Sequence, residues 1–98
     1  MAKKLPPLHP GEVLREEYLK PLGLTAYALA KLLDVPRTRI ERIAREEEGI
    51  SADTALRLGR YFRTSPEFWM NLQDRFELET KRRALGDRLE RIGERASA

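Results

Sequence analysis

The sequence predicts an all-α protein built from five helices, and three observations lead to this prediction. Apolar residues recur at steps of three and four along most of the chain, which is the spacing of amphipathic helices. Residues that favour helix starts and stops, such as Thr25 and Asp34, divide the chain into short segments. No stretch long enough to form a strand alternates apolar with polar residues, so strands are not expected.

Length and composition limit the class of protein. A chain of 98 residues, 41% hydrophobic and 36% charged, suits one domain with a modest core. The net charge of +3 is weak evidence for a nucleic-acid partner. The absence of cysteine excludes disulfides, thiolate chemistry and cysteine zinc sites. No apolar run has the length of a membrane span or the form of a signal peptide, so we expect a cytoplasmic protein with no membrane partner.

Residues 1–8 are expected to form a flexible arm, and the first helix follows. It opens at His9-Pro10-Gly11-Glu12, where proline fits because its missing N–H has no partner in a first turn. Pro21-Leu22-Gly23 ends it. The only histidine, His9, lacks sequence neighbours for acid–base chemistry or a metal site, so we interpret it as a residue of the helix start.

The next two helices are short and closely spaced. Thr25 is expected to cap a helix over Ala26–Leu33, with a core stripe of Leu29, Leu32 and Leu33, and Asp34 stops it. A third helix is expected to begin at Pro36 and the segment to close at Gly49. Its buried positions are Ile40, Ile43 and Ala44.

Ser51 and Ser65 are expected to cap the fourth and fifth helices. The inward stripe of the fourth helix is predicted to be Ala52, Ala55, Leu56, Gly59 and Phe62. The buried face of the fifth helix is predicted to be Phe68, Trp69, Leu72 and Phe76. At helical spacing in a small domain these aromatic residues are interpreted as core and not as a platform for stacking bases. The domain is predicted to span residues 9–78.

The pattern changes after residue 78, and residues 79–98 are predicted to be a helical tail that extends the C-terminal helix. From residue 78 onward the apolar positions resemble a short heptad seam that Arg82 interrupts. These positions are Leu78, Leu85, Leu89 and Ile92. Gly86 and Gly93 weaken a helix, so we expect fraying toward Ala98. Three roles remain open for the tail: a homodimer contact, a docking surface for another protein, and packing against its own bundle.

Residues 25–44, TAYALAKLLDVPRTRIERIA, have the spacing of a helix-turn-helix. Ala30 permits close helix crossing, Val35 lies in the turn, and the second helix is expected to enter the major groove with its N-terminal residues toward the bases. We predict base or near-base contacts from Arg37, Thr38, Arg39 and Arg42, because arginine pairs with guanine and threonine with base edges or a thymine methyl. The weaker candidates for phosphate are Tyr27, Lys31 and Arg45.

Four stretches resemble the HigA/VapI antitoxin family, a branch of the Xre/Cro-type helix-turn-helix proteins. They are HPGEVLREEYLKPLGLT (9–25), YALAKLLDVPRTRIERI (27–43), GISADTALRLGRYF (49–62) and TSPEFWMNLQDRFEL (64–78). The resemblance implies a lambda-repressor-like bundle that binds a palindromic operator in double-stranded DNA as a homodimer and represses its own operon. It also implies a cognate HigB-like, mRNA-cleaving toxin that the protein neutralises. No enzymatic activity, cofactor or metal site is implied.

The sequence departs from the family after the third helix. Relatives usually carry a short Asn-Gly-basic loop there, whereas this chain reads Arg45-Glu46-Glu47-Glu48-Gly49. Three carboxylates near DNA would repel its phosphates, so we expect weaker binding or a different contact geometry. Two alternatives therefore stay open: a stand-alone Xre-type transcriptional regulator, and a protein-interaction module with weak or no DNA binding.

Overall fold

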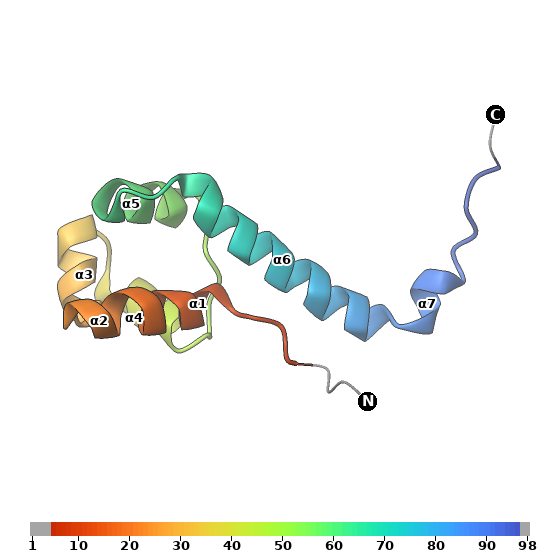
Figure 1. The fold of residues 1–98 in the computed structure, drawn as a ribbon, viewed down its shortest axis with the longest axis horizontal. Coiled ribbons are helices and arrows are strands. Elements are labelled where there is room, and N and C mark those ends of the chain that lie inside the picture. Colours follow the sequence, from red (N-terminus) through yellow and green to blue (C-terminus); the bar gives the residue numbers. More distant parts are fainter. Residues whose placement is uncertain (1–4, 97–98) are drawn as a thin grey trace.

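The computed structural model describes residues 5–96, and within that range it contains helices, connecting segments and no strand (Figure 1). The elements are α1 (Pro10–Val13), the π-helical turn η1 (Leu14–Leu19), α2 (Lys20–Leu22), α3 (Ala26–Leu33), α4 (Arg37–Ala44), α5 (Ala52–Phe62), α6 (Pro66–Leu85) and α7 (Asp87–Glu90). Because α1, η1 and α2 follow one another without interruption, residues 5–96 form the five predicted helices and one final turn. The all-α prediction is confirmed.

The first helix begins as predicted at His9 and contains an unpredicted π turn. The His9 side chain caps it, with Nδ1 accepting a hydrogen bond from the Gly11 N–H at 2.8 Å. Farther along, Pro21 would clash with the carbonyl of Glu17 in a regular α-helix. The wider turn of η1, in which the Lys20 N–H donates to the Arg15 carbonyl, lets the helix continue to Leu22 despite the proline.

Three side-chain caps fix where α3, α5 and α6 begin. Thr25, Ser51 and Ser65 each accept a hydrogen bond from the backbone N–H three residues later, at 3.0 to 3.2 Å. These are the caps that the sequence predicts, and each satisfies an N–H that has no partner inside its helix. The helix starts are therefore set by local chemistry.

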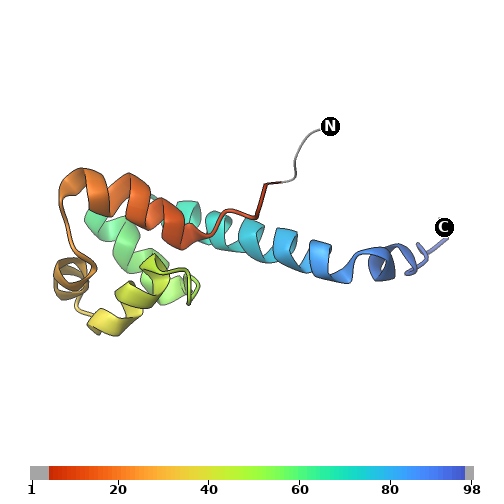
Figure 2. The same cartoon turned by 90° about the horizontal axis from the view of Figure 1, so that it is seen from below.

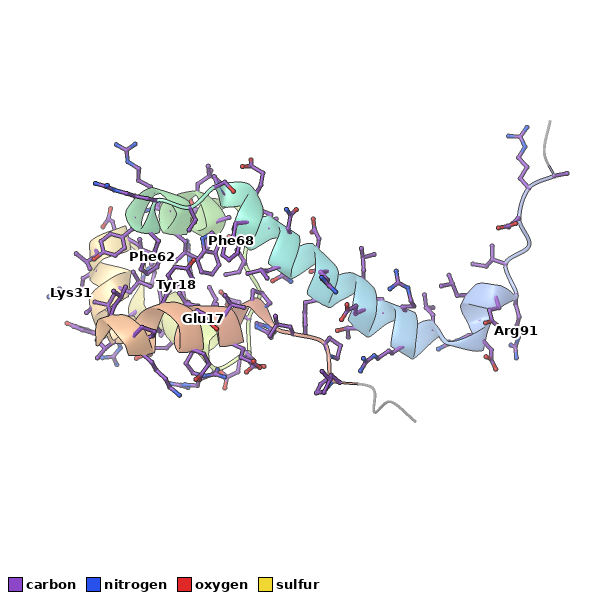
Figure 3. The ribbon with its side chains drawn as sticks, viewed as in Figure 1. Glu17, Tyr18, Lys31, Phe62, Phe68 and Arg91 are labelled. Atoms are coloured by element: carbon purple, nitrogen blue, oxygen red, sulfur yellow. The ribbon has the colours of Figure 1, made fainter. Side chains whose placement is uncertain are left out.

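The core lies between the first helix, α3, α4, α5 and the start of α6. Its buried apolar residues are Leu14, Leu19, Leu29, Ala30, Leu33, Ile40, Ile43, Ile50, Ala55, Leu58 and Trp69. Trp69 is fully buried, and its indole N–H donates to Thr64 Oγ1 at 2.8 Å. The rings of Tyr18 and Phe62 point into the space between the first helix and α5, with centroids 5.1 and 6.4 Å from that of Trp69 (Figure 3). Of the three aromatic residues predicted to be core in the fifth helix, Trp69 is fully buried, Phe76 is partly buried and Phe68 is exposed.

Several predicted burial positions are wrong. Leu32 is 54% exposed, Leu56 is 60% exposed, and Ala52 is also exposed, whereas Leu58 and Thr54 are buried. The reason is that α5 packs against both α6 and α3. This packing buries the face of α5 that carries Thr54 and Leu58. Leu32 and Leu56, which were predicted to be buried, instead line an open surface depression between α3 and α5.

The segment after α4 also differs from the prediction, because the helix ends at Ala44 and Glu46 takes the left-handed conformation (φ 64°). Gly49 serves a different purpose. A Cβ at Gly49 would lie 2.6 Å from Oε1 of Gln73, a buried side chain that accepts a hydrogen bond from the Ile50 N–H at 2.7 Å. The small residue lets α6 hold this loop through Gln73.

The helix α6 projects well beyond the bundle (Figures 1 and 2). It runs through residue 78 without a break and ends at Leu85, before Gly86 with φ 49° and the single turn α7. The predicted domain boundary at residue 78 therefore coincides with no helix end and stays a prediction. All described residues from 80 to 96 are exposed, so the tail of this chain does not pack against its own bundle.

The predicted arm is described only from residue 5 onward, and residues 1–4 lie outside the described part. Within it, the Leu5 carbonyl accepts a hydrogen bond from the Arg83 guanidinium of α6. Residues 5, 6 and 8 share a surface hollow with Leu72 and Arg83. No helix in residues 5–96 is long and apolar enough to cross a membrane.

Candidate nucleic-acid interface

The helices α3 and α4 form the predicted helix-turn-helix, joined by Asp34, Val35 and Pro36. Asp34 has a left-handed backbone (φ 57°), and the Val35 N–H donates to the carbonyl of the fully buried Ala30 at 3.0 Å. Arg57 of α5 donates to the carbonyls of Leu33 and Asp34 at 2.7 and 3.2 Å. The turn is therefore held by α5 as well as by its own backbone.

One side of α4 is buried and the opposite side is open. Ile40 and Ile43 are fully buried, which leaves an exposed face that includes Arg37, Thr38 and Arg42 and continues to Arg45. Successive helix residues lie about 100° apart, so these four positions fall within an arc of roughly 140°. A helix face of this width can follow a major groove.

Arg39 lies on a different side of α4, about 100° round the helix from Thr38 and toward α5. Its Nη1 lies 2.5 Å from Asp53 Oδ2, and Nε of Arg57 reaches the same oxygen at 3.0 Å. The hydrogen bonds from Arg39 and Arg57 hold the pKa of Asp53 below its ordinary value. Arg39 would have to leave this carboxylate to reach a base, so its predicted base contact stays a prediction.

Tyr27 and Lys31, the predicted phosphate residues of α3, lie beside the Arg37 end of the exposed face of α4. The ring of Tyr27 is half-exposed, with the Lys31 ammonium 5.4 Å and the Arg37 guanidinium 5.7 Å from its centroid. Lys31 points outward from α3 (Figure 3). The structure thus gathers Tyr27, Lys31 and Arg37 into one cationic cluster and places Arg45 at the opposite end of α4.

Glu41 is a member of this face that the sequence analysis missed. It lies between Arg37 and Arg45 round the helix, is partly exposed, and its Oε2 lies 3.8 Å from Nε of Arg37. The spacing of four residues between opposite charges on a helix is the sequence signal that identifies such a pair.

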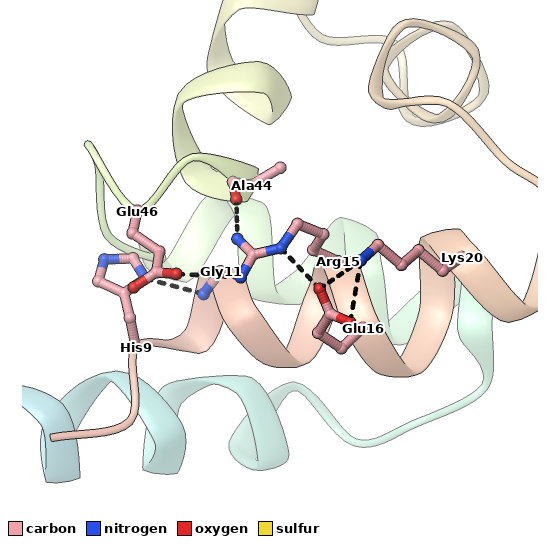
Figure 4. Close-up of polar contacts among 7 residues, drawn as sticks. All are labelled: His9, Gly11, Arg15, Glu16, Lys20, Ala44 and Glu46. Atoms are coloured by element: carbon pink, nitrogen blue, oxygen red, sulfur yellow. Dashed lines mark hydrogen bonds and ion pairs between the residues drawn. The ribbon is translucent and has the colours of Figure 1, made fainter. Parts of the chain in front are cut away.

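The acidic segment after α4 is partly neutralised by the first helix (Figure 4). Arg15 donates from Nη1 to the Ala44 carbonyl, and its Nη2 lies 3.1 Å from Glu46 Oε2. Its Nε lies 2.9 Å from Glu16, which also pairs with Lys20 at 2.9 Å. The hydrogen bonds from Lys20 and Arg15 lower the pKa of Glu16. The three consecutive glutamates are all exposed but not equivalent, because Glu46 pairs with Arg15 while no ion pair among the described residues involves Glu47 or Glu48.

The described residues contain no group of three or more His, Asp or Glu side chains with the geometry of a metal site. The buried His9 accepts a backbone hydrogen bond and stacks edge-on with Phe76, with ring centroids 4.6 Å apart. Its role at the helix start is confirmed.

Comparisons with known proteins agree with this geometry. A helix-turn-helix family model matches residues 16–69. Virulence-associated protein I of Dichelobacter nodosus is 57% identical over 76 residues, which is 78% of this chain and 70% of that protein. The chain belongs to the HigA/VapI family of helix-turn-helix proteins.

Two solved structures extend the similarity of this HigA/VapI-family chain to nearly its whole length. The structure of the Pseudomonas aeruginosa antitoxin HigA with the higBA promoter is 47% identical and covers 93% of this chain and 99% of its own, with a TM-score of 0.88. The antitoxin GraA in complex with its operator is 44% identical and covers 100% of this chain and 99% of its own, also with a TM-score of 0.88.

Proposed function

We propose that the protein is the antitoxin of a type II toxin–antitoxin pair, which represses its own operon by binding a palindromic operator and also neutralises an mRNA-cleaving, HigB-like toxin. The observation that carries the proposal is the open face of α4 with Arg37, Thr38 and Arg42. It is supported by the similarity of almost the whole chain to antitoxin structures that contain promoter or operator DNA.

In this proposal α4 lies in the major groove. Arg37 and Arg42 pair with guanine, and Thr38 contacts a base edge or a thymine methyl. Glu41 orients Arg37 or accepts a hydrogen bond from the amino group of a cytosine. Tyr27 and Lys31 contact phosphate near one end of α4, and Arg45 does so near the other. A homodimer would bind two half-sites about 34 Å apart.

The proposal also gives the tail a role as a contact surface for a second copy of the chain or for the toxin. The residues Leu78, Leu85, Leu89 and Ile92 are exposed, so they are free to contact a second copy of the chain or the toxin. The break at Gly86 separates the first two from the last two, so the four residues do not continue one straight seam.

We assign the protein no catalytic role and place it in the cytoplasm, where its DNA partner lies.

Fluorescence anisotropy tests the DNA-binding part. The purified protein is titrated against a duplex from immediately upstream of its own gene and against a scrambled duplex of equal length, each at two salt concentrations. We expect tighter binding to the native duplex and an affinity that falls as salt rises. Equal and feeble binding to both duplexes would refute a repressor and favour the protein-interaction module, which the exposed Glu47 and Glu48 support.

A second experiment tests the toxin. The reading frame adjacent to the gene is expressed in cells with and without this protein. Growth arrest that co-expression relieves would support the antitoxin, and the absence of a growth effect beside intact DNA binding would favour a stand-alone regulator.

A further inference from the structure

Arg15 joins three groups that belong to different parts of the helix-turn-helix domain. One guanidinium nitrogen donates to the carbonyl of Ala44, the last residue of α4, and a second lies 3.1 Å from the carboxylate of Glu46 (Figure 4). The third nitrogen pairs with Glu16 of the first helix. One side chain therefore holds the C-terminal end of α4 and neutralises the acidic residue that follows it.

The backbone at Glu46 has a defined conformation that follows the end of α4. Its φ of 64° lies in the left-handed region, which glycine and asparagine tolerate better than glutamate. This backbone is closed by hydrogen bonds from the Glu46 N–H to the Ile43 carbonyl at 2.9 Å and from the Glu47 N–H to the Arg42 carbonyl at 2.8 Å. The Glu46 side chain is then directed at Arg15, whose guanidinium is only partly exposed.

We infer that Arg15 is a positioning residue for DNA binding, which holds the end of α4 and neutralises Glu46 so that the acidic loop can lie beside the phosphate backbone. This inference rests on the proposed function, because it concerns how α4 approaches DNA. An unpaired carboxylate at Glu46 would repel nearby phosphates, whereas the paired one presents little net charge. The exposed carboxylates of Glu47 and Glu48 then remain.

The inference is distinct from a direct contact between Arg15 and DNA. Three nitrogens of its guanidinium already serve protein acceptors, and a direct phosphate contact would require some of these bonds to break. If Arg15 acts by neutralising Glu46, removing both charges together restores binding. If Arg15 contacts phosphate itself, removing Glu46 relieves its repulsion but does not restore the lost phosphate contact, so the combined variant still binds more weakly than the unmodified protein.

The experiment is a double-mutant cycle on the full chain, with Arg15→Gln, Glu46→Gln and the combined variant. Affinity is measured by fluorescence anisotropy for the native upstream duplex and for the scrambled duplex, at two salt concentrations. Arg75→Gln is the matched control, because it removes an arginine from an exposed ion pair with Glu79 on α6. Circular dichroism and thermal melts establish that each variant is folded at the assay temperature.

We expect Arg15→Gln to weaken binding to both duplexes by about fivefold at low salt, with a smaller loss at high salt because exposed charges are screened. Glu46→Gln alone binds at least as tightly as the unmodified protein, the combined variant returns to within about twofold of it, and Arg75→Gln changes nothing.

A combined variant that stays more than about twofold weaker than the unmodified protein would overturn the inference, as would an Arg15→Gln variant that binds normally. The unmodified protein tests the proposed function separately: equal binding to native and scrambled duplexes would refute sequence-specific repression. The phosphate effect would still be measurable on either duplex.

Discussion

Gly11 provides a direct test of how the first helix positions α4. A Cβ built on Gly11 would lie 1.8 Å from the carbonyl oxygen of Ile43 and 2.9 Å from its carbonyl carbon. Cβ contacts under 3.0 Å are essentially not observed, so Gly11→Ala requires the two backbones to separate by about 1.2 Å, the difference between 3.0 and 1.8 Å. No rotamer change can relieve this contact, because the Ile43 atoms are backbone.

The expected cost is at the upper end of the range for overpacking, about 3 kcal/mol in the free energy of unfolding. For a domain of this size each kcal/mol shifts Tm by roughly 4–8 °C, so a decrease of about 12–24 °C is expected. Thermal unfolding followed by circular dichroism measures it. The same displacement moves the end of α4, so affinity for the upstream duplex should fall even below Tm.

Gly93→Ala is the matched control, since a Cβ at Gly93 has no atom within 4 Å and its φ is not left-handed. We expect its Tm to stay close to that of the unmodified protein. A Gly11→Ala variant that melts within about 3 °C of the unmodified protein would show that the first helix and α4 are not in the close contact described.

Two further predictions concern pH and the tail. Burial lowers the pKa of His9 from its ordinary value of 6.5, with a smaller opposing effect from Glu46 and a smaller lowering effect from Arg15. Because the unfolded chain then binds more protons than the folded one, stability is fully present above pH 6.5 and is lost as pH falls below it. Chemical unfolding between pH 7.5 and 5 should show this loss, and His9→Asn, a non-titrating cap, should remove it. An identical slope in both proteins would exclude His9 as the cause. Deleting residues 79–98 should convert a dimer to a monomer in light scattering if the exposed tail leucines form the homodimer contact, whereas an unchanged dimer would place that contact elsewhere.

Helix starts were predictable from sequence because a cap is a local interaction. Thr25, Ser51 and Ser65 each accept a hydrogen bond from an N–H three residues away. These caps can therefore be predicted without knowing which distant parts of the chain lie nearby. Asp34 was predicted to end its helix from the same kind of local signal, and it takes a left-handed backbone there. The helix-turn-helix followed from the spacing of these signals and from the small residue Ala30.

Burial was less predictable, because it depends on which helices pack against a given face. Leu32 and Leu56 fit a helical stripe in sequence yet face outward, and Leu58 takes the inner place on α5. Gln73 is a polar residue whose burial requires the Ile50 N–H, which lies 23 positions away in the chain. Local periodicity contains no signal for a bond of this kind.

The candidate site was predicted in composition and only partly in arrangement. Arg37, Thr38 and Arg42 do lie on the exposed side of α4. Arg39 instead meets Asp53, and Glu46 meets Arg15. Both are ion pairs between separate helices or loops, and their partners lie 14 and 31 positions away. Charges in sequence identify such residues as surface groups but do not identify their partners.

Base readout by the exposed face of α4 is tested most directly by Arg37→Ala. The measurement is the ratio of the Kd for the scrambled duplex to that for the native upstream duplex, by fluorescence anisotropy, for the unmodified protein, Arg37→Ala and the control Arg75→Ala. Arg37 is 61% exposed and lies beside Tyr27, so its removal should leave the fold intact. We predict that the ratio falls by the equivalent of about 1–3 kcal/mol for Arg37→Ala and is unchanged for Arg75→Ala. An Arg37→Ala variant that keeps the full ratio would contradict base readout by this face.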